Sequence, residues 1–123
     1  MSAPGPLNVV KNGDVTVVVF GPQHRQLAEV GLEEISNQLV EVAKSATPPL
    51  VVIDMAITEF FGSSFIEVLF RVWKQINSQP NAKFAISGLQ PYCREVLEIT
   101  HLDRLWPMYA TRDEAIKALS PGS

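Results

Sequence analysis

Two adjacent serines, Ser63 and Ser64, are the side chains whose type and position best suit a chemical modification. They stand at the head of an apolar segment with helical periodicity, and Ser64 with Glu67 matches a capping box. Ser63 would then lie just outside the helix with its hydroxyl accessible. A helix N-terminus attracts anions through its free N–H groups and its dipole, so a phosphoryl group on Ser63 would be stabilised there. The alternative is that both serines serve only as caps.

A predicted strand precedes the serines. The run from Leu50 to Asp54 consists of four apolar residues and a carboxylate, which is typical of a strand buried on both faces. When such a strand is followed by a short loop and a helix, the loop lies at the carboxyl edge of an α/β sheet, where ligands and partners usually bind. We expect Asp54 to hold the loop from Met55 to Gly62 by accepting backbone N–H bonds.

The other reactive side chains do not form a catalytic or metal-binding pattern. Cys93 follows Pro91 and Tyr92, which places it in the first turn of a helix. We expect a buried or half-buried structural thiol, because no histidine is placed to act as its base. His24 and His101 are expected at surface or loop positions. Without a Gly-rich phosphate loop, a nucleophile elbow or a paired Cys and His spacing, we expect no enzyme and no bound cofactor or metal.

Composition and charge narrow the class of protein. A chain of 123 residues with 46% hydrophobic content can bury its own core, so we expect one domain over 7–119 with flexible tails at 1–6 and 120–123. A net charge of −3 argues against nucleic acid as a partner. No apolar run approaches the roughly 20 residues of a membrane span, and the start does not resemble a signal peptide. With a single cysteine, these features predict a cytoplasmic protein without membrane insertion.

Periodicity predicts an α/β domain with a mixed sheet of four to five strands and about four helices. Asn12-Gly13 between two apolar runs indicates an antiparallel hairpin. Pro91 suits the start of a helix, Pro107 fits a strand only near a sheet edge, and Thr111 matches a second capping box. The predicted strands are 7–10, 15–20, 50–54, 83–87 and 106–109, and the predicted helices are 28–42, 65–76, 91–100 and 112–119.

The helix after the serines carries a polar line beside its core stripe. Glu67 and Arg71 have the i,i+4 spacing of an ion pair, and the line continues through Lys74 and Ser78. Phe70 falls beside this line at about 100° per residue, which predicts a partly exposed ring. Such a ring is a candidate anchor for a partner, and the alternative is that a neighbouring loop covers it.

A resemblance to a known family covers more than half of the chain. The stretch from Leu50 to Leu119 resembles the STAS domain of bacterial anti-anti-sigma factors, in which an apolar strand ends in Asp and leads through a short loop to Asp-Ser-Ser-Gly and a helix. Asp54 and Ser63 are in register with this pattern, and Ser63 falls on the family's phosphorylated serine. Gly62 replaces the acid before the serines, Phe65 replaces the glycine after them, and Glu67 replaces the next small residue of the family pattern. Two later segments also resemble the family: Cys93–Tyr109 and Asp113–Leu119.

The resemblance implies a STAS-like fold and an anti-sigma factor antagonist that acts by partner switching. Such a protein binds an anti-sigma factor that is also a serine kinase, and phosphorylation of Ser63 controls the binding; a serine phosphatase is a further candidate partner. The expected partner face comprises Ser63, Ser64, Glu67 and Phe70. The alternative is a STAS scaffold or ligand-sensing module that is not phosphorylated, for example one associated with a lipid transporter.

Overall fold

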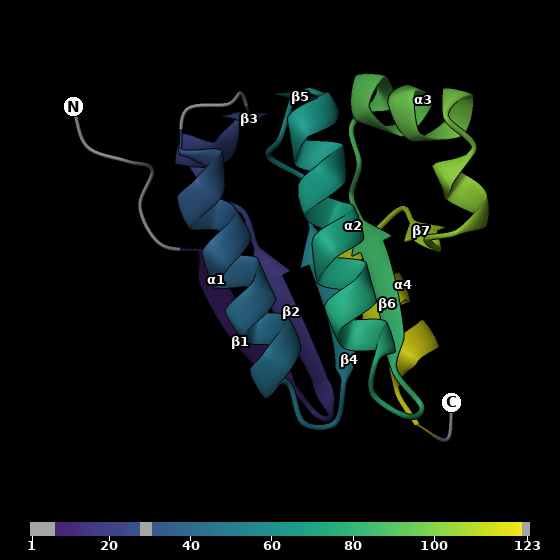
Figure 1. Cartoon of the computed structure of the whole chain (residues 1–123). Coiled ribbons are helices and arrows are strands. Elements are labelled where there is room, and N and C mark those ends of the chain that lie inside the picture. Colours follow the sequence, from purple (N-terminus) through teal and green to yellow (C-terminus); the bar gives the residue numbers. More distant parts are fainter. Residues whose placement is uncertain (1–6, 28–30, 122–123) are drawn as a thin grey trace.

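The computed structural model describes residues 7–27 and 31–121, which form a five-stranded mixed sheet with helices on both faces (Figure 1). The sheet has the order β1-β2-β4-β6-β7, with strands β1 (Asn8–Asn12), β2 (Val15–Val19), β4 (Leu50–Asp54), β6 (Lys83–Ser87) and β7 (Met108–Tyr109). A small parallel sheet pairs β3 (Gln26–Leu27) with β5 (Phe60–Phe61). The helices are α1 (Leu32–Ser45), α2 (Ser63–Asn77), α3 (Pro91–Ile99) and α4 (Arg112–Leu119), with short 3-10 helices η1 (Pro22–His24) and η2 (Leu102–Arg104). This architecture confirms the predicted α/β class.

The predicted hairpin joins β1 and β2. Asn12 pairs with Val15, so Gly13 and Asp14 form a two-residue turn. Gly13 has a φ of +60°, a conformation that a residue without Cβ adopts at little cost. All other neighbours in the large sheet pair in parallel. Helices α1 and α2 return the chain to the opposite end of the sheet after β2 and β4, whereas the short β7 pairs with the last two residues of β6.

The sheet separates two apolar layers. Helices α1 and α2 cover one face, and α4 lies behind the sheet on the other (Figure 1). Strand β4 contributes to both layers: Val51 and Ile53 belong to the core under α1 and α2, whereas Leu50 and Val52 face α4. All five residues of this strand are buried, which confirms the prediction of a strand covered on both sides.

The parallel strands β2, β4 and β6 all end at one edge of the sheet, here called the carboxyl edge. Figure 1 shows the start of α2, the small sheet and α3 gathered at this edge. Backbone N–H groups of Glu59 and Phe60 both donate to the carbonyl of Arg25, at 2.7 and 3.1 Å, and thereby bind the loop after β4 to the loop after β2. These two hydrogen bonds hold the residues before Ser63 against the loop after β2.

Most predicted boundaries agree with the structure. The predicted strand 83–87 coincides with β6, α3 begins at Pro91, and β7 follows Pro107 at the edge of the sheet. The predicted start of the first helix, Ala28, lies outside the described residues, as do residues 1–6, 122 and 123. None of the described helices is long and apolar enough to cross a membrane.

His24 lies in the connection after β2, which is one of the two positions predicted for it, but it is not at the surface. Its side chain is fully buried, because η1 folds the chain back over the end of β2. The N–H of Gly21 donates to its Nδ1 at 3.0 Å, and its ring lies edge-on to Phe20 with 5.2 Å between the ring centroids. His101, by contrast, is exposed as predicted, and it precedes η2 as its N-cap with a φ of +63°.

Candidate functional site at the carboxyl edge

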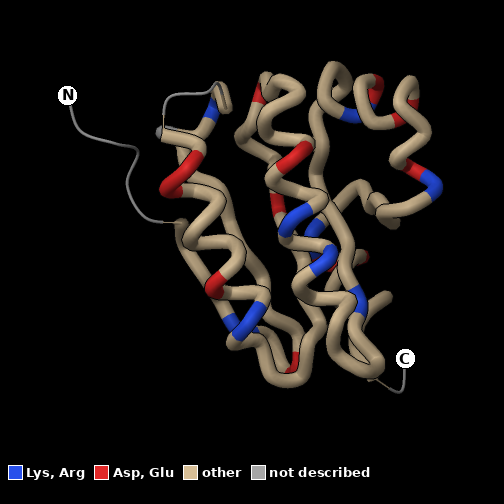
Figure 2. Tube along the Cα trace, viewed as in Figure 1, with Lys and Arg blue, Asp and Glu red and all other residues tan. Residues whose placement is uncertain are grey.

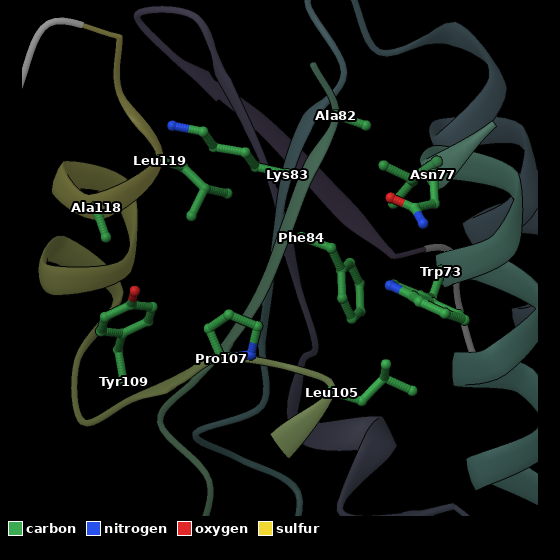
Figure 3. A pocket seen from close by; sticks show the side chains of 11 residues that line it. Trp73, Asn77, Ala82, Lys83, Phe84, Leu105, Pro107, Tyr109, Ala118 and Leu119 are labelled. Atoms are coloured by element: carbon green, nitrogen blue, oxygen red, sulfur yellow. The ribbon is translucent and has the colours of Figure 1, made fainter. Parts of the chain in front are cut away.

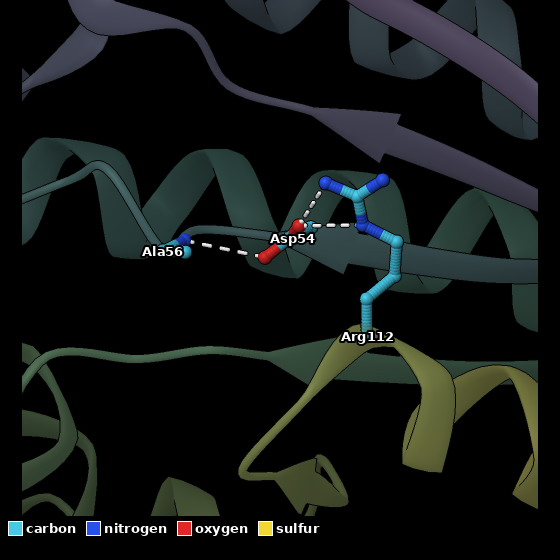
Figure 4. A network of polar contacts seen from close by, with 3 residues as sticks. All are labelled: Asp54, Ala56 and Arg112. Atoms are coloured by element: carbon cyan, nitrogen blue, oxygen red, sulfur yellow. Dashed lines mark hydrogen bonds and ion pairs between the residues drawn. The ribbon is translucent and has the colours of Figure 1, made fainter.

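Asp54 ends β4 with a buried carboxylate that holds two separate segments (Figure 4). Its Oδ1 accepts a bond from the N–H of Ala56 at 3.2 Å, which is one of the loop contacts that the sequence predicts. Its Oδ2 accepts a bond from Nε of Arg112 at 2.8 Å and lies 2.8 Å from Nη2 of the same residue. Because Arg112 is the first residue of α4, this ion pair connects the loop after β4 to a helix on the opposite face of the sheet.

The loop after β4 is also held by the end of β6. Gly88 has a φ of +73°, and a Cβ at this position would lie 2.9 Å from Oδ1 of Asp54 and 3.1 Å from Cβ of Ala56. Nε2 of Gln90 donates to the carbonyl of Ala56 at 2.7 Å. Only a glycine allows this approach, so the segment from β6 to α3 lies directly against the loop that leads to the serines.

The predicted capping box is wrong, because α2 begins two residues earlier than the sequence indicates. Gly62 is the N-cap, with φ −102° and ψ −174°, and its carbonyl accepts bonds from the N–H groups of Phe65 and Ile66 at 3.1 and 3.4 Å. Ser63 and Ser64 are therefore the first two residues of the helix, and neither side chain caps it. Strand β5 runs straight into the helix, so tertiary pairing of β5 with β3 sets the start of α2 in place of a side-chain cap.

The two serines differ in their surroundings. Ser63 is exposed, whereas Ser64 is half-buried and lines a groove between α1 and α2 with Glu33, Ser36 and Arg71. The backbone N–H groups of Ser63 and Ser64 belong to the first turn, where no helical acceptor exists. The accessible hydroxyl of Ser63 thus lies beside free N–H groups, at the positive end of the helix dipole.

The expected pair of Glu67 and Arg71 is not formed in the described part of the chain, where the ion pairs are those of Asp54 with Arg112 and Arg94 with Glu98. Arg71 instead donates from Nη1 to Oγ of Ser36 on α1, at 2.6 Å. Along α2 the acidic residue lies nearer the serine end, and the basic residues follow it along the helix (Figure 2). Glu67 is exposed and adds negative charge one turn from Ser63.

Phe70 packs against the loop after α3. Of the two alternatives for its ring, this is the one in which a neighbouring loop covers it. Its ring centroid lies 4.9 Å from that of the buried Trp106 and 6.4 Å from that of Trp73. The residue remains only half-exposed. Sequence periodicity located the position correctly but contained no information about the distant tryptophan that covers it.

An exposed aromatic pair lies at the carboxyl edge instead. Phe60 of β5 and Tyr92 of α3 stack with 5.6 Å between ring centroids and an angle of 24° between the rings. Their exposed fractions are 39% and 50%. Sequence patterns do not predict this pair, because its members are far apart in the chain and the only local signal is the apolar pair Phe60-Phe61. Exposed aromatic rings of this kind are typical of protein interfaces.

Cys93 is a structural thiol. It is fully buried in the first turn of α3, and its Sγ lies 3.8 Å from the carbonyl oxygen of Thr58. Burial raises its pKa to about 11, against a smaller opposing effect of a backbone hydrogen bond with Phe61. A thiol with such a pKa carries little thiolate near neutral pH and is a poor nucleophile. Among residues 7–27 and 31–121, no group of three or more His, Cys, Asp or Glu side chains could hold a metal ion.

Comparison with known proteins identifies the family to which the fold belongs. The family model described as STAS domain matches residues 8–115. The anti-sigma-F factor antagonist RsfB of Mycobacterium tuberculosis is 24% identical over 124 residues, which cover 99% of this chain and 97% of that protein. Among solved structures, an anti-sigma-factor antagonist (STAS) domain protein from Planctomyces limnophilus is 40% identical, with a TM-score of 0.88 over 94% of this chain and 98% of that one. An anti-sigma factor antagonist from Mycobacterium paratuberculosis is 25% identical, with a TM-score of 0.78 over 92% of both chains. The chain belongs to the STAS domain family.

Proposed function

We propose that this chain is an anti-sigma factor antagonist that binds an anti-sigma factor with serine kinase activity and is controlled by phosphorylation of Ser63. The names of its relatives in two mycobacteria and in Planctomyces limnophilus support the general role. The observation that carries the proposal is the placement of Ser63, which is exposed on the first turn of α2 and held there by the loops of the carboxyl edge.

The residues that depart from the family pattern leave access to Ser63 open. Phe65 is fully buried, and its ring packs on Phe61 and Phe20 with centroid distances of 5.4 and 5.9 Å, so it does not cover the serine. Gly62 presents no side chain, and a Cβ there would meet no atom within 4 Å. Neither residue therefore covers the Ser63 hydroxyl, and Glu67 lies one turn further along the helix.

A phosphoryl group would change the charge of the proposed partner face. It adds about −1.5 to −2 charges near neutral pH. Glu67 lies one turn along α2, Glu59 precedes β5, and the first turn of α1 contains Glu33 and Glu34. The phosphoryl group would add its charge to those of these carboxylates. The modified surface would repel an acidic partner and would oppose burial of Phe60 against an apolar one.

The test is incubation of the purified chain with the anti-sigma serine kinase of the source organism and ATP, followed by mass spectrometry of its peptides. We expect phosphate on Ser63, none after Ser63→Ala, and normal modification of the matched variant Ser64→Ala. In calorimetric titrations Ser63→Ala should bind the kinase like the unmodified chain, and Ser63→Asp should bind more weakly. Modification of Ser64, or no modification under conditions in which a related antagonist is phosphorylated, would contradict the proposal.

The second candidate function is a scaffold or ligand-sensing module that is not phosphorylated. The replacement of the family's acid by Gly62 favours it, because a kinase that reads that carboxylate would find none here. Recovery of transporter subunits alone, when the tagged chain is isolated from its source cell, would favour this candidate over partner switching.

A further inference from the structure

The two edges of the large sheet differ in how they are covered. At one end, the segment that contains β7 lies along β6: the N–H of Ile86 donates to the carbonyl of Pro107, and Figure 3 shows Pro107 close to the buried Phe84. At the other end lies β1, whose five residues are all exposed. Within residues 7–27 and 31–121, no strand pairs with the outer side of β1.

Alternation along β1 identifies the backbone groups that face outward. The two-residue turn makes Asn12 and Val15 a hydrogen-bonded pair, and every second residue of β1 shares the orientation of Asn12. Val9 and Lys11 are the residues in between, so their N–H and C=O groups point away from β2. Within the described chain, these backbone groups have no hydrogen-bond partner. Outward groups of this kind are a template for a further strand.

Leu7 supports this alternation and marks where the open edge ends. It lies two positions before Val9, so its N–H also points away from β2. This N–H donates to Oε1 of Gln38 on α1 at 2.8 Å. The edge is therefore occupied at Leu7 by the protein's own side chain and is open from Val9 to Lys11.

Lys11 is the one charged residue of β1, and its amine is turned away from the edge. Its Nζ donates to the carbonyl of Thr47 at 3.0 Å, beside a groove that Val9 and Val42 also line on the α1 face of the sheet. A lysine on an edge strand disfavours any register in which it lies opposite a second lysine. Its charge therefore selects among the possible registers.

One antiparallel register pairs two copies of β1 along their whole length. A twofold axis at Val10 places Val9 opposite Lys11 of the second copy, and this pair occurs twice, so four backbone hydrogen bonds form. An axis at Lys11 would place two lysines opposite each other. An axis at Val9 would place Lys11 opposite Leu7, whose N–H is already bonded to Gln38. Pairing Val9 with Val10 fails because the backbone of Val10 bonds β2.

The side chains also match in this register. On the α4 face of the sheet, Val10 meets its own copy at the axis, and Asn8 meets Asn12 of the second copy. On the α1 face, Val9 contacts the aliphatic stem of Lys11 of the second copy. The two valines are 48% and 41% exposed in the single chain, so the pairing covers apolar surface that is otherwise in water.

We propose that the outer edge of β1 is a homodimer interface, in which two copies pair antiparallel about Val10 and join their sheets into one. The occupant is a second copy because the strand is complementary to itself: valine meets valine, amide meets amide, and the lysines stay apart. An edge contact of five residues is smaller than the roughly 1,200 Å² that stable complexes bury, so the dimer is weak and depends on concentration. Because β2 separates β1 from β4, dimerisation is independent of the modification of Ser63.

The experiment is NMR of the ¹⁵N-labelled full chain from micromolar to millimolar concentration. We expect the amides of Val9 and Lys11 to shift and to exchange more slowly as the concentration rises, whereas the amide of Val10 is protected throughout. Val9→Pro removes an outward N–H and no bond to β2, so it should weaken association about tenfold or more. The matched control Val9→Thr keeps this N–H and the branched shape, and it should associate like the unchanged protein.

Cysteine substitution tests the register by a second route. With the axis at Val10, Val10→Cys places two thiols directly opposite each other, within the Cα separation of about 4.4–6.8 Å that a disulfide requires. Mild oxidation should therefore give a covalent dimer. Lys11→Cys places its two thiols diagonally across the axis and should give little dimer. Cys93 is buried and is the same in both variants.

Four results would overturn the proposal. The first is that the amides of Val9 and Lys11 do not change up to millimolar concentration. The second is that they are protected from exchange at every concentration, because the edge would then be covered by its own chain. The third is that a folded Val9→Pro variant associates as well as Val9→Thr. The fourth is that Lys11→Cys forms the covalent dimer more readily than Val10→Cys. None of these outcomes bears on the modification of Ser63.

Discussion

The ion pair of Asp54 and Arg112 allows a prediction in which the two partners have unequal roles. The carboxylate is 6% exposed, whereas the Arg112 side chain is 44% exposed. Replacing Arg112 with Ala therefore leaves a buried negative charge, but replacing Asp54 with Ala leaves a guanidinium that water can hydrate. The helix itself tolerates Arg112→Ala, because alanine is the best helix former and a cation at the first position of α4 opposes the helix dipole.

The magnitudes follow from the contacts that remain. After Arg112→Ala, Asp54 keeps only the N–H of Ala56 at 3.2 Å. Removing one partner of a buried pair costs about 3–5 kcal/mol, and because the pair opens toward solvent on the Arg112 side we expect about 2–4 kcal/mol of unfolding free energy to be lost. Asp54→Ala strands the N–H of Ala56 and should cost about 1–3 kcal/mol. The double variant should cost less than the sum by about 1–2 kcal/mol, because the two residues share one interaction.

Urea unfolding of the four proteins, followed by circular dichroism, measures these free energies. Arg94→Ala is the matched control: it breaks an ion pair whose side chains are 46% and 48% exposed, and it should cost about 0.3–0.5 kcal/mol. If Arg112→Ala destabilises the chain no more than Arg94→Ala does, the buried carboxylate is not held by the guanidinium. Strict additivity in the double variant would likewise refute the assigned contact.

Three further predictions concern glycines and the thiol. Gly62→Asp should raise the unfolding free energy, measured in urea, by a few tenths to about 1 kcal/mol. The backbone of Gly62 is extended and its Cβ position is open, so a carboxylate there can cap α2. No gain in stability would mean that α2 does not begin at this position. Gly88→Ala should lower it by about 1–3 kcal/mol in the same assay, since φ is +73° and the new Cβ would meet Asp54; an unchanged midpoint would contradict this contact. Burial raises the pKa of Cys93 from 9.0 to about 11. At mildly alkaline pH its reaction with a thiol-specific reagent should therefore be about a hundredfold slower in the folded chain than in urea. Equal rates in the two states would show that the thiol is exposed. Because the folded pKa lies above the unfolded one, stability should be constant below about pH 9 and fall as pH rises toward 11.

Local sequence determined the elements whose signals lie within a few residues. Asn12-Gly13 between apolar runs specifies a tight turn through backbone sterics, and Thr111 caps α4 by accepting a bond from the N–H of Glu114 at 3.1 Å. Pro91 begins α3 because its missing N–H is not needed in the first turn. The apolar run that ends in Asp54 forms a buried strand, as predicted. Neither face of the strand has polar side chains that could face water along its length, so both faces are covered.

Only the tertiary structure decided which distant residues meet. Ser64 fits the local pattern of a cap, but the pairing of β5 with β3 starts the helix at Ser63. Arg71 has a partner one turn away in sequence and bonds Ser36 of α1 instead, because packing of the two helices brings that hydroxyl within 2.6 Å. The partner of Asp54 lies 58 positions further along the chain, and only the crossover connections of a parallel sheet bring Arg112 to the same edge. Contacts of this kind depend on the closure of long loops, and a pattern confined to neighbouring residues contains no information about it.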